Sequence, residues 1–535
     1  MTNVNWLDRV IASVVPGYAM RRLAARVAMQ ELAGLGERRY EAARRGRRTE
    51  GWMAPGTSAN AEIGPQLATL RNRSRELGRN NPMAARIFSI VPAKMVGTGI
   101  TPRAEGLGSR VKQRSRDEWQ RFSDNCDPQG LQDWPGIQQS AARTVMESGA
   151  ALLRFLPRPN VGPAETPLQV RVLEPDYIDL GRTQRLNDGG AIIQGVEFDA
   201  EGRRRAYWLF DEHPGDSFGL NLAGGLGGAD RGFGGFVSRR VDAEFVRAVF
   251  DIRRPGQVHG VPWLAPAAVK MRDVDDLEEA RLVKKKIESC FVAFVHKSDP
   301  SSPLAAGTTT DSKQRRIEKV SPGMINYLGP DEQVTFGEPK SSEGDTEWLI
   351  MQMHAIAAAA GATYSMATGD LRRANYSNTR AGNLDFWALL DGWQHLMLIP
   401  QLCRPTWAML DRLLLGLGRR QASIPGAVWD VPERPLVDPD KDGRALDSAV
   451  RSGRRTLKEV IAARGRDPEA HLEEIADTNA LIDALELVLD SDPRLTSSQG
   501  GRVGKPGEHA GGDDSEVEQD EDENDGESED EEAGA

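Results

Sequence analysis

A helical spacing of apolar residues persists over residues 376–415 and constrains the fold of this chain more than any other feature. Apolar side chains recur there at steps of three and four, which places them on one face of an α-helix. At about 1.5 Å per residue, such a helix is about 60 Å long. Pro400 is predicted to kink it, because proline lacks a backbone donor and its ring collides with the preceding turn. A helix longer than a closed domain of this size needs predicts a wall element repeated around an axis.

Two shorter helical patterns precede the long one, at residues 273–296 and 346–360. The first is expected to end at Ser298-Asp299-Pro300, because proline disfavours helical geometry in the residue before it. Between them, short apolar runs alternate with Pro- and Gly-containing turns, which predicts two or three small strands. The sequence therefore predicts two helices that hold a compact β module at one end.

Length and composition bound the class of protein. A chain of 535 residues has room for two to four subdomains. No run of eighteen apolar residues occurs, so no membrane-spanning helix and no membrane partner are expected. The three cysteines, Cys126, Cys290 and Cys403, are far apart in sequence. They are interpreted as free thiols in a reducing compartment, not as disulfides or zinc ligands.

The acidic charge of the chain is concentrated at its end. Residues 513–532 contain fourteen Asp or Glu and no Lys or Arg, so the formal net charge of −11 becomes +3 once this acidic tail is set aside. From residue 496 onward no apolar periodicity remains, and disorder is predicted. The tail either mimics nucleic acid and occupies basic partners, or keeps the protein soluble.

The remaining sequence alternates between helical and β patterns. Residues 20–48 are Arg-rich and read either as a solvated helix or as a basic arm that contacts nucleic acid or an acidic neighbour. Helices are predicted at 65–80, 82–96, 110–122, 131–148, 441–452, 456–464 and 468–489. Strands are predicted at 151–156, 168–173, 191–198, 205–210 and 245–252, with an extended segment at 427–435.

The sequence contains no convincing catalytic, cofactor or metal site. No nucleophile elbow, phosphate loop or metal-ligand spacing of His and Cys occurs. The acids between Asp273 and Glu279 lack the glycine that a calcium loop needs at its sixth position, where Glu278 stands. They lie near a predicted helix start, where acidic side chains interact favourably with the helix dipole. The prediction is a non-enzyme with no cofactor.

The loop before the long helix carries the candidate contact residues Arg372, Arg373, Asn375 and Tyr376. If the long helices line a channel, this loop projects into it and the arginines touch passing phosphates, a contact indifferent to base sequence. Alternatively, both arginines pair with acids of a neighbouring subunit. The residue pattern leaves these two interpretations open.

Several motifs, in order over residues 65–475, resemble the portal proteins of lambda-type tailed bacteriophages. The segments that carry the resemblance are Arg79-Asn80-Asn81-Pro82, Gly97-Thr98-Gly99-Ile100, Glu174-Pro175-Asp176, Gly195-Val196-Glu197, Ala206-Tyr207-Trp208, Arg254-Pro255-Gly256-Gln257, Gly260-Val261-Pro262, Leu264-Ala265-Pro266, Asn375-Tyr376-Ser377, Asp438-Pro439 and Gly465-Arg466-Asp467-Pro468. Two positions depart from the pattern: Arg247 stands where a histidine is expected, and His259 where an arginine usually precedes Gly260.

The resemblance implies an α+β portal fold that assembles into a ring, commonly dodecameric. The implied parts begin with an N-terminal arm (1–64) and a wing with a helical hairpin and a β-rich part (65–270). Stem helix 1 (271–297), a small α/β or β clip (298–345) and stem helix 2 (346–361) follow. The chain then continues with a tunnel loop (362–378), a kinked tunnel helix returning to the wing (379–437), a helical crown (438–495) and the acidic tail (496–535).

The resemblance also implies a function and partners. Such a ring lies at one capsid vertex of the virion, is assembled in the host cytoplasm, and lets double-stranded DNA pass during packaging and ejection. Its partners are the terminase large subunit, a head-completion or connector protein and the major capsid or scaffold protein. Asp275, Asp276 and Glu279 on stem helix 1 either keep the channel wall repulsive to DNA or face a neighbouring subunit. The alternatives are a metal-dependent enzyme acting on nucleic acid and a non-portal structural adaptor.

Overall fold

The computed structural model describes residues 47–487, with gaps at 53, 105–107, 159–161, 163–164, 217–236, 290–292, 297–324, 329–344, 421, 423, 425, 433, 435–438, 465 and 467. The chain divides into two compact units. Unit 1 comprises Met1–Ile90, Ala141–Arg154 and Val172–Arg373, and unit 2 comprises Val91–Ser140, Phe155–Arg171 and Ala374–Ala535. Among the described helices, none is long and apolar enough to cross a membrane.

Short, well-capped helices open unit 1. Ser58 caps α3 (Ala59–Ile63), since its side chain accepts a hydrogen bond from the Ala61 amide. A 3₁₀ turn, η3 (Gly64–Gln66), leads into α4 (Leu67–Asn80), which buries one side chain per turn along a single face. Helix α5 (Pro82–Val96) begins with Pro82, where the missing amide hydrogen costs no helical bond. The helices predicted at 65–80 and 82–96 are therefore present, and their packing as a hairpin remains a prediction.

Two sheets supply the β-rich part of the described chain. Strand β2 (Ala150–Pro157) pairs with β9 (Val246–Phe250), and β3 (Leu168–Leu173) completes that sheet. The second sheet has the order β4-β5-β6-β7-β8. Its strands are β4 (Gln184–Arg185), β5 (Ala191–Ile193), β6 (Val196–Phe198), β7 (Arg204–Phe210) and β8 (Ser238–Asp242).

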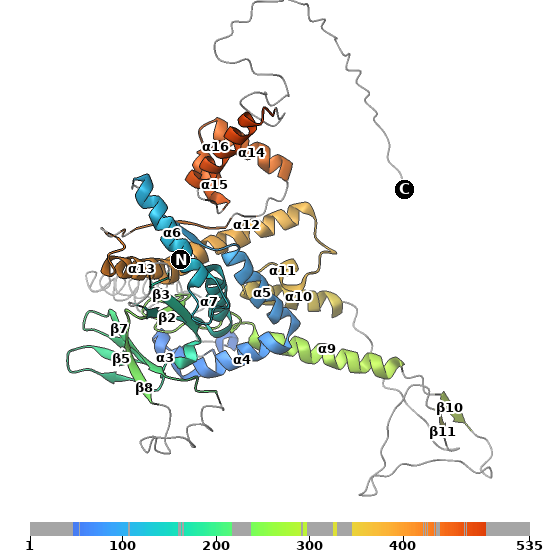
Figure 1. Ribbon diagram of the computed structural model, residues 1–535. Coiled ribbons are helices and arrows are strands. Elements are labelled where there is room, and N and C mark those ends of the chain that lie inside the picture. Colours follow the sequence, from blue (N-terminus) through green and yellow to red (C-terminus); the bar gives the residue numbers. More distant parts are fainter. Residues whose placement is uncertain are drawn as a thin grey trace, which may run out of the picture. The chain divides into compact units, whose positions relative to one another are not determined.

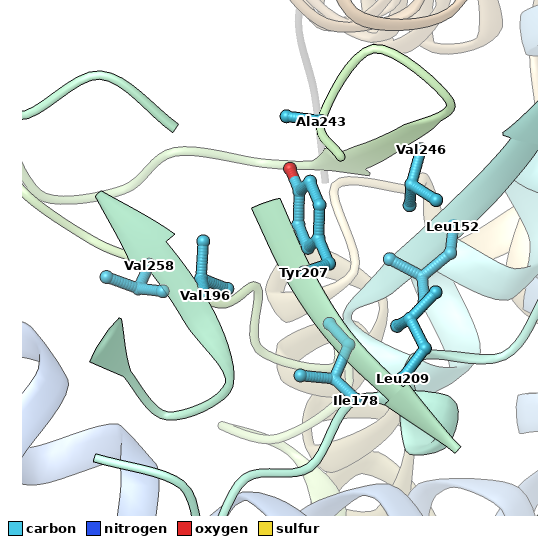
Figure 2. Close-up of a cluster of buried hydrophobic side chains, with 8 residues drawn as sticks. All are labelled: Leu152, Ile178, Val196, Tyr207, Leu209, Ala243, Val246 and Val258. Atoms are coloured by element: carbon cyan, nitrogen blue, oxygen red, sulfur yellow. The ribbon is translucent and has the colours of Figure 1, made fainter. Parts of the chain in front are cut away.

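Side chains from both sheets form one apolar cluster (Figure 2). Leu152 on β2 and Val246 on β9 come from the first sheet, and Tyr207 and Leu209 on β7 come from the second. Ile178, Val196, Ala243 and Val258 complete the cluster. Complete burial of an aliphatic or aromatic side chain contributes about 1.5–3 kcal/mol. This cluster therefore holds the β-rich part of unit 1 together.

The segment predicted as one strand at 191–198 is two strands joined by a two-residue turn. Gln194 and Gly195 both have positive φ, 49° and 80°, as a tight hairpin turn requires. Glycine adopts this geometry without steric cost, but Gln194 needs support. Its amide donates to the Thr183 hydroxyl, and its carbonyl oxygen lies 2.9 Å from His259 Nε2. The prediction of a single strand was wrong, because a turn of only two residues hardly interrupts the apolar pattern of the two strands that it joins.

Helices α9 (Ala268–Ser289) and α10 (Asp345–Ala359) are the two shorter helices expected from the sequence. Helix α9 begins earlier than predicted, and it also ends earlier, because 293–296 form strand β10 (Ala293–His296). Aromatic and β-branched residues at 294 and 295 favour strand over helix. Strand β10 pairs in parallel with β11 (Ile325–Leu328), while the rest of the predicted clip at 298–345 lies mostly outside the described residues. Figure 1 shows α9 leading to these strands and α10 following them in the chain.

Unit 2 contains the predicted long helical run in three segments. Helix α12 (Tyr376–Gly392), a π-helical stretch (Trp393–Cys403) and α13 (Arg404–Gly416) follow one another without interruption. Pro400 lies inside the π-helical stretch, whose wider turns are shown by the Arg404 amide donating to the Ile399 carbonyl, five residues earlier. The helical run is thus present, and the size of a bend at Pro400 remains a prediction.

An aromatic core holds unit 2 together. Trp119 on α6 (Ser109–Asn125) packs against Phe122, Trp134, Trp407 and Trp429, with ring centroids 5.1–6.2 Å apart. These rings come from α6, α7 (Trp134–Ser148), α13 and β12 (Val428–Asp430), and β12 pairs with β1 (Thr101–Arg103). Helices α14 (Pro439–Arg451), α15 (Leu457–Ala463) and α16 (Pro468–Ala484) form the predicted C-terminal helical part.

The two described cysteines are buried free thiols, as expected. Burial raises the pKa of the Cys126 thiol to about 12, and burial likewise raises the pKa of Cys403. Such thiols are poor nucleophiles, because the thiolate is the reactive form. Cys290 lies outside the described residues.

Candidate functional site

Helix α9, the predicted stem helix 1, has buried side chains in its first turns and none over residues 275–286. Met271 and Val274 are buried, whereas the apolar side chains of Leu282 and Val283 are about half exposed. Exposed apolar side chains that cluster on one element mark a surface for another molecule. The part of α9 around Leu282 and Val283 is therefore a candidate surface for contact with another molecule.

The three candidate stem acids have different surroundings. Both carboxylate oxygens of Asp275 accept hydrogen bonds from Asn81 Nδ2, at 2.7 and 2.9 Å. Asp276 is exposed and lies 4.0 Å from the Arg272 guanidinium, and Glu279 is exposed. Asp275 thus joins α9 to the corner between α4 and α5, while the other two side chains are open to a ligand or a neighbour. Their role in a channel remains a prediction.

Helix α10, the predicted stem helix 2, also leaves apolar surface uncovered. Ile356 and Ala357 are buried, but Trp348 and Met351 are 49% and 64% exposed. Since a tryptophan is among the largest apolar side chains, an exposed one is costly in water. Within a single chain, these two side chains are therefore not covered.

The start of the predicted tunnel loop is a compact structure. Thr363 caps α11 (Tyr364–Thr368), and Gly369 ends it with φ 77°, in the left-handed region that favours glycine. Asp370 then accepts hydrogen bonds from the amide and guanidinium of Arg372, at 2.9–3.0 Å, and from the Tyr364 hydroxyl. Hydrogen bonds from the Arg372 side chain are the main cause that holds the pKa of Asp370 well below its usual range. Asp370 therefore stays charged and neutralises Arg372.

Arg373 is paired in the same way. Its guanidinium lies 2.9 Å from the carboxylate of Glu347 on α10, and both side chains are exposed. Exposed ion pairs of this kind are weak, about 0–1 kcal/mol, so a phosphate can compete for the arginine. Both loop arginines thus pair with acids of their own subunit, an arrangement the sequence did not indicate.

Asn375 and Tyr376 shape the start of α12. The Asn375 side chain accepts a hydrogen bond from the Asn378 amide at 2.8 Å and so caps the helix. The Tyr376 hydroxyl accepts one from Arg380, and its ring is about half exposed. Asn375 thus has a structural role in the described chain, and contact of either residue with DNA remains a prediction.

A groove that the sequence did not reveal lies among α5, α9, α10 and α11 in unit 1. Its walls include Met83, Met271, Met353 and Ile356, with Asn81 at one side. Arg86 on α5 donates to the Met366 carbonyl of α11 at 2.7 Å and fixes the tunnel-loop helix. The only sequence signal for this region was the Asn81-Pro82 pair.

A charged cluster in unit 1 was also missed. Glu174, Asp176 and His213 bring three metal-ligand atoms within 4.8 Å of one another. Arg75 pairs with both carboxylates, and the positive charge of the fully buried Arg71 also acts on Asp176. Burial raises the pKa of Asp176, but the Arg75 hydrogen bond and both arginine charges outweigh it and lower that pKa. The arginines already neutralise the acids, so we interpret the cluster as an ion-pair network.

The described surfaces therefore offer uncovered apolar helices beside a neutralised polar loop, which suits assembly more than catalysis. The sequence model of the family described as "Phage portal protein, lambda family" matches residues 45–394. This chain belongs to that family. It is a phage portal protein in function, and the family is a structural one.

Two portal proteins are similar over most of this chain. The probable portal protein of Halomonas phage phiHAP-1 is 24% identical over 468 residues, which cover 82% of this chain and 86% of that protein. The portal protein of Escherichia phage N15 is 19% identical over 485 residues, which cover 79% and 86%. The family and its named relatives agree with the resemblance seen in the sequence.

A weaker structural similarity links this chain to solved chains from gene transfer agent (GTA) particles. A chain from the virion of a native GTA particle has a TM-score of 0.38 and 15% identity, covering 75% of this portal protein and 93% of that chain. A chain from the neck of an empty GTA particle has a TM-score of 0.40 and 14% identity, with the same coverage.

Proposed function

We propose that copies of this portal protein form a closed, commonly dodecameric ring at one capsid vertex, around a passage for double-stranded DNA. The observation that carries the proposal is the apolar surface left uncovered on the described helices α9 and α10 in unit 1 and, separately, on α12 in unit 2. Its largest side chains are Trp348, Met351, Leu282 and Leu384, each about half exposed or more. A ring supplies the missing neighbours from identical chains.

The pairing of the loop arginines with acids lowers the affinity of the proposed passage for DNA. DNA must move without being held, and affinity for phosphate rises with the number of unpaired Lys and Arg side chains presented. Asp370 and Glu347 hold Arg372 and Arg373 in pairs, so the loop presents little net positive charge. The exposed acids Asp276 and Glu279 add repulsion along stem helix 1. Together these charges favour a wall over which DNA slides.

The ring is also proposed to be a docking platform. Its partners are the terminase large subunit, a head-completion or connector protein, and the major capsid or scaffold protein. The docking residues fall partly in the clip, and the protein is placed in the virion after assembly in the host cytoplasm. Co-purification of the terminase large subunit with the assembled ring, but not with the monomer, is the expected result.

Electron microscopy of the purified chain tests the ring directly. Closed rings with a central hole are expected in negative stain. Monomers or compact dimers without an axial hole would contradict the proposal. The Trp348→Ser/Met351→Ser variant is expected to show separate subunits under the same conditions, because it removes the apolar surface that joins the copies.

A further inference from the structure

The outer face of α6 in unit 2 presents a basic groove. Four arginines line it, Arg110, Arg114 and Arg121 from α6 and Arg419 from the segment after α13, together with the acids Asp117 and Glu118. The lining therefore carries two positive charges more than negative ones. None of the predicted tunnel-loop residues lines this groove.

Two of the four arginines are held by the protein itself. Glu118 is buried, pairs with Arg121 at 3.0 Å and lies 4.0 Å from Arg419. Arg419 also donates to the backbone carbonyl of Glu165 at 2.9 Å. These contacts fix the floor of the groove and compensate its buried charge.

The other two arginines are open. Arg110 and Arg114 are both exposed, stand four residues apart on α6 and so share one face of it. Within the described part of the chain, neither guanidinium has an acidic partner. Asp117, the nearest acid along the helix, accepts a hydrogen bond from Gln113 at 3.1 Å. The groove thus offers two free cations to an anionic ligand.

An anionic segment of the same chain is within reach of this groove. Lys112 on α6 pairs with Glu469 at the start of α16, with 2.7 Å between the charged atoms. Helix α16 ends at Ala484 and is about 25 Å long. Residues 485–512 can then span up to about 90 Å before the fourteen acids of 513–532 begin. The tail can therefore return to α6 without any strain on its length.

We propose that the acidic tail, 513–532, binds the Arg110–Arg114 groove of its own chain. The tail offers many carboxylates in sequence, so several registers satisfy both arginines equally well. Because the two partners are joined by one chain, their effective concentration is in the millimolar range, and weak exposed ion pairs are sufficient. The bound tail covers exposed basic side chains that would otherwise bind phosphate.

Photo-crosslinking in the full-length chain tests this inference. A photoreactive residue at Gln113, between the two arginines, is expected to crosslink to 513–532 and to give a product of single-chain size. The Arg110→Glu/Arg114→Glu variant should lower the yield about tenfold, because two attractive pairs become repulsive ones. The matched control, Arg73→Glu/Arg185→Glu, reverses two other exposed arginines and should leave the yield unchanged.

A second variant tests the other side of the contact. Replacement of the fourteen tail acids by Asn and Gln keeps the length and should abolish the crosslink. Crosslinks of two-chain size, crosslinks elsewhere, or equal yields in the groove variant and its control would overturn the proposal. So would a duplex DNA of about two helical turns that binds the unmodified full chain and loses binding in the groove variant alone, since the groove would then serve nucleic acid.

Discussion

The two units differ in how far they bury their large apolar side chains. The aromatic core of unit 2 buries them, whereas helices α9 and α10 of unit 1 leave several exposed. In unit 2, Trp134 is fully buried and lies within 5.7 Å of neighbouring rings. In unit 1, Trp348 on α10 is 49% exposed, and Leu282 and Val283 on α9 are open as well. The core of unit 2 is complete within a single chain, whereas the proposed function has copies of the chain cover the exposed side chains of α9 and α10. Stability and assembly should therefore depend on different residues.

The largest effect is expected in the aromatic core. Trp134→Ala should lower the free energy of unfolding by about 3–5 kcal/mol, because it removes a fully buried ring and leaves a cavity. Urea unfolding followed by circular dichroism measures it. Leu131→Ala, at an exposed side chain just before the same helix, is the control and should change stability by less than about 0.5 kcal/mol. Equal effects of the two variants would contradict a self-sufficient core.

The stem surface should behave in the reverse manner. Trp348→Ser/Met351→Ser should change the stability of the isolated chain by less than about 1 kcal/mol, because both side chains are already exposed. The same change should reduce the ring fraction about tenfold in mass photometry, since a few large apolar side chains dominate most interfaces. If the variant formed rings at the normal fraction, the exposed side chains of α10 would have no role in assembly, and the contrast between the two units would not hold.

A pH effect is expected in the β-rich part of unit 1. Burial is the main cause that lowers the pKa of His259 to about 3, from an ordinary value near 6.5. Between these values the unfolded chain binds more protons, so stability is lost as pH falls, by up to about 1.4 kcal/mol per pH unit. Unfolding of His259→Gln across pH 4–7 should show a flatter slope. An unchanged slope would mean that His259 does not stay neutral beside the Gln194 turn.

The smallest effect is expected at the tunnel loop. Asp370→Asn should free Arg372 to contact phosphate, because its pairing carboxylate is lost. The salt dependence of ring–DNA affinity, plotted on logarithmic axes, should then steepen by about 0.9 for each arginine that contacts DNA. Arg372→Gln removes the same ion pair together with the cation and serves as the control. Equal slopes in the two variants would show that pairing does not restrain the loop arginine.

The sequence predicted the features that depend on neighbouring residues. Helical periodicity located α9, α10 and the run through Pro400, and turn residues located most strands. Two predictions were wrong where a short segment fits both a helix and a strand, or both a strand and a turn. Residues 293–296, expected in a helix, form a strand that includes aromatic and β-branched residues. The Gln194-Gly195 turn divides one expected strand into two. Local pattern alone cannot decide these cases, because strand pairing with a distant segment settles them.

The candidate site was predicted in type but not in its contacts. The loop residues Arg372 and Arg373 were identified from charge and position, yet their pairing with Asp370 and Glu347 follows from how α10 and α11 fold. Similarly, the sequence left open whether Asp275 faces the channel or a neighbouring subunit, and it did not indicate that the Asp275 carboxylate accepts hydrogen bonds from Asn81. Periodicity indicates which face of a helix is apolar and does not reveal whether the same subunit or a second copy covers it.

Hydroxyl-radical footprinting of the assembled and dissociated protein tests most directly whether the exposed side chains of the stem helices become buried against other copies of the chain. Trp348 and Met351 should be oxidised readily in the isolated chain and protected at least several-fold in the ring, while the buried Trp134 should be protected in both states. Equal oxidation of Trp348 and Met351 in ring and isolated chain would show that these surfaces do not join the copies, and would contradict the account.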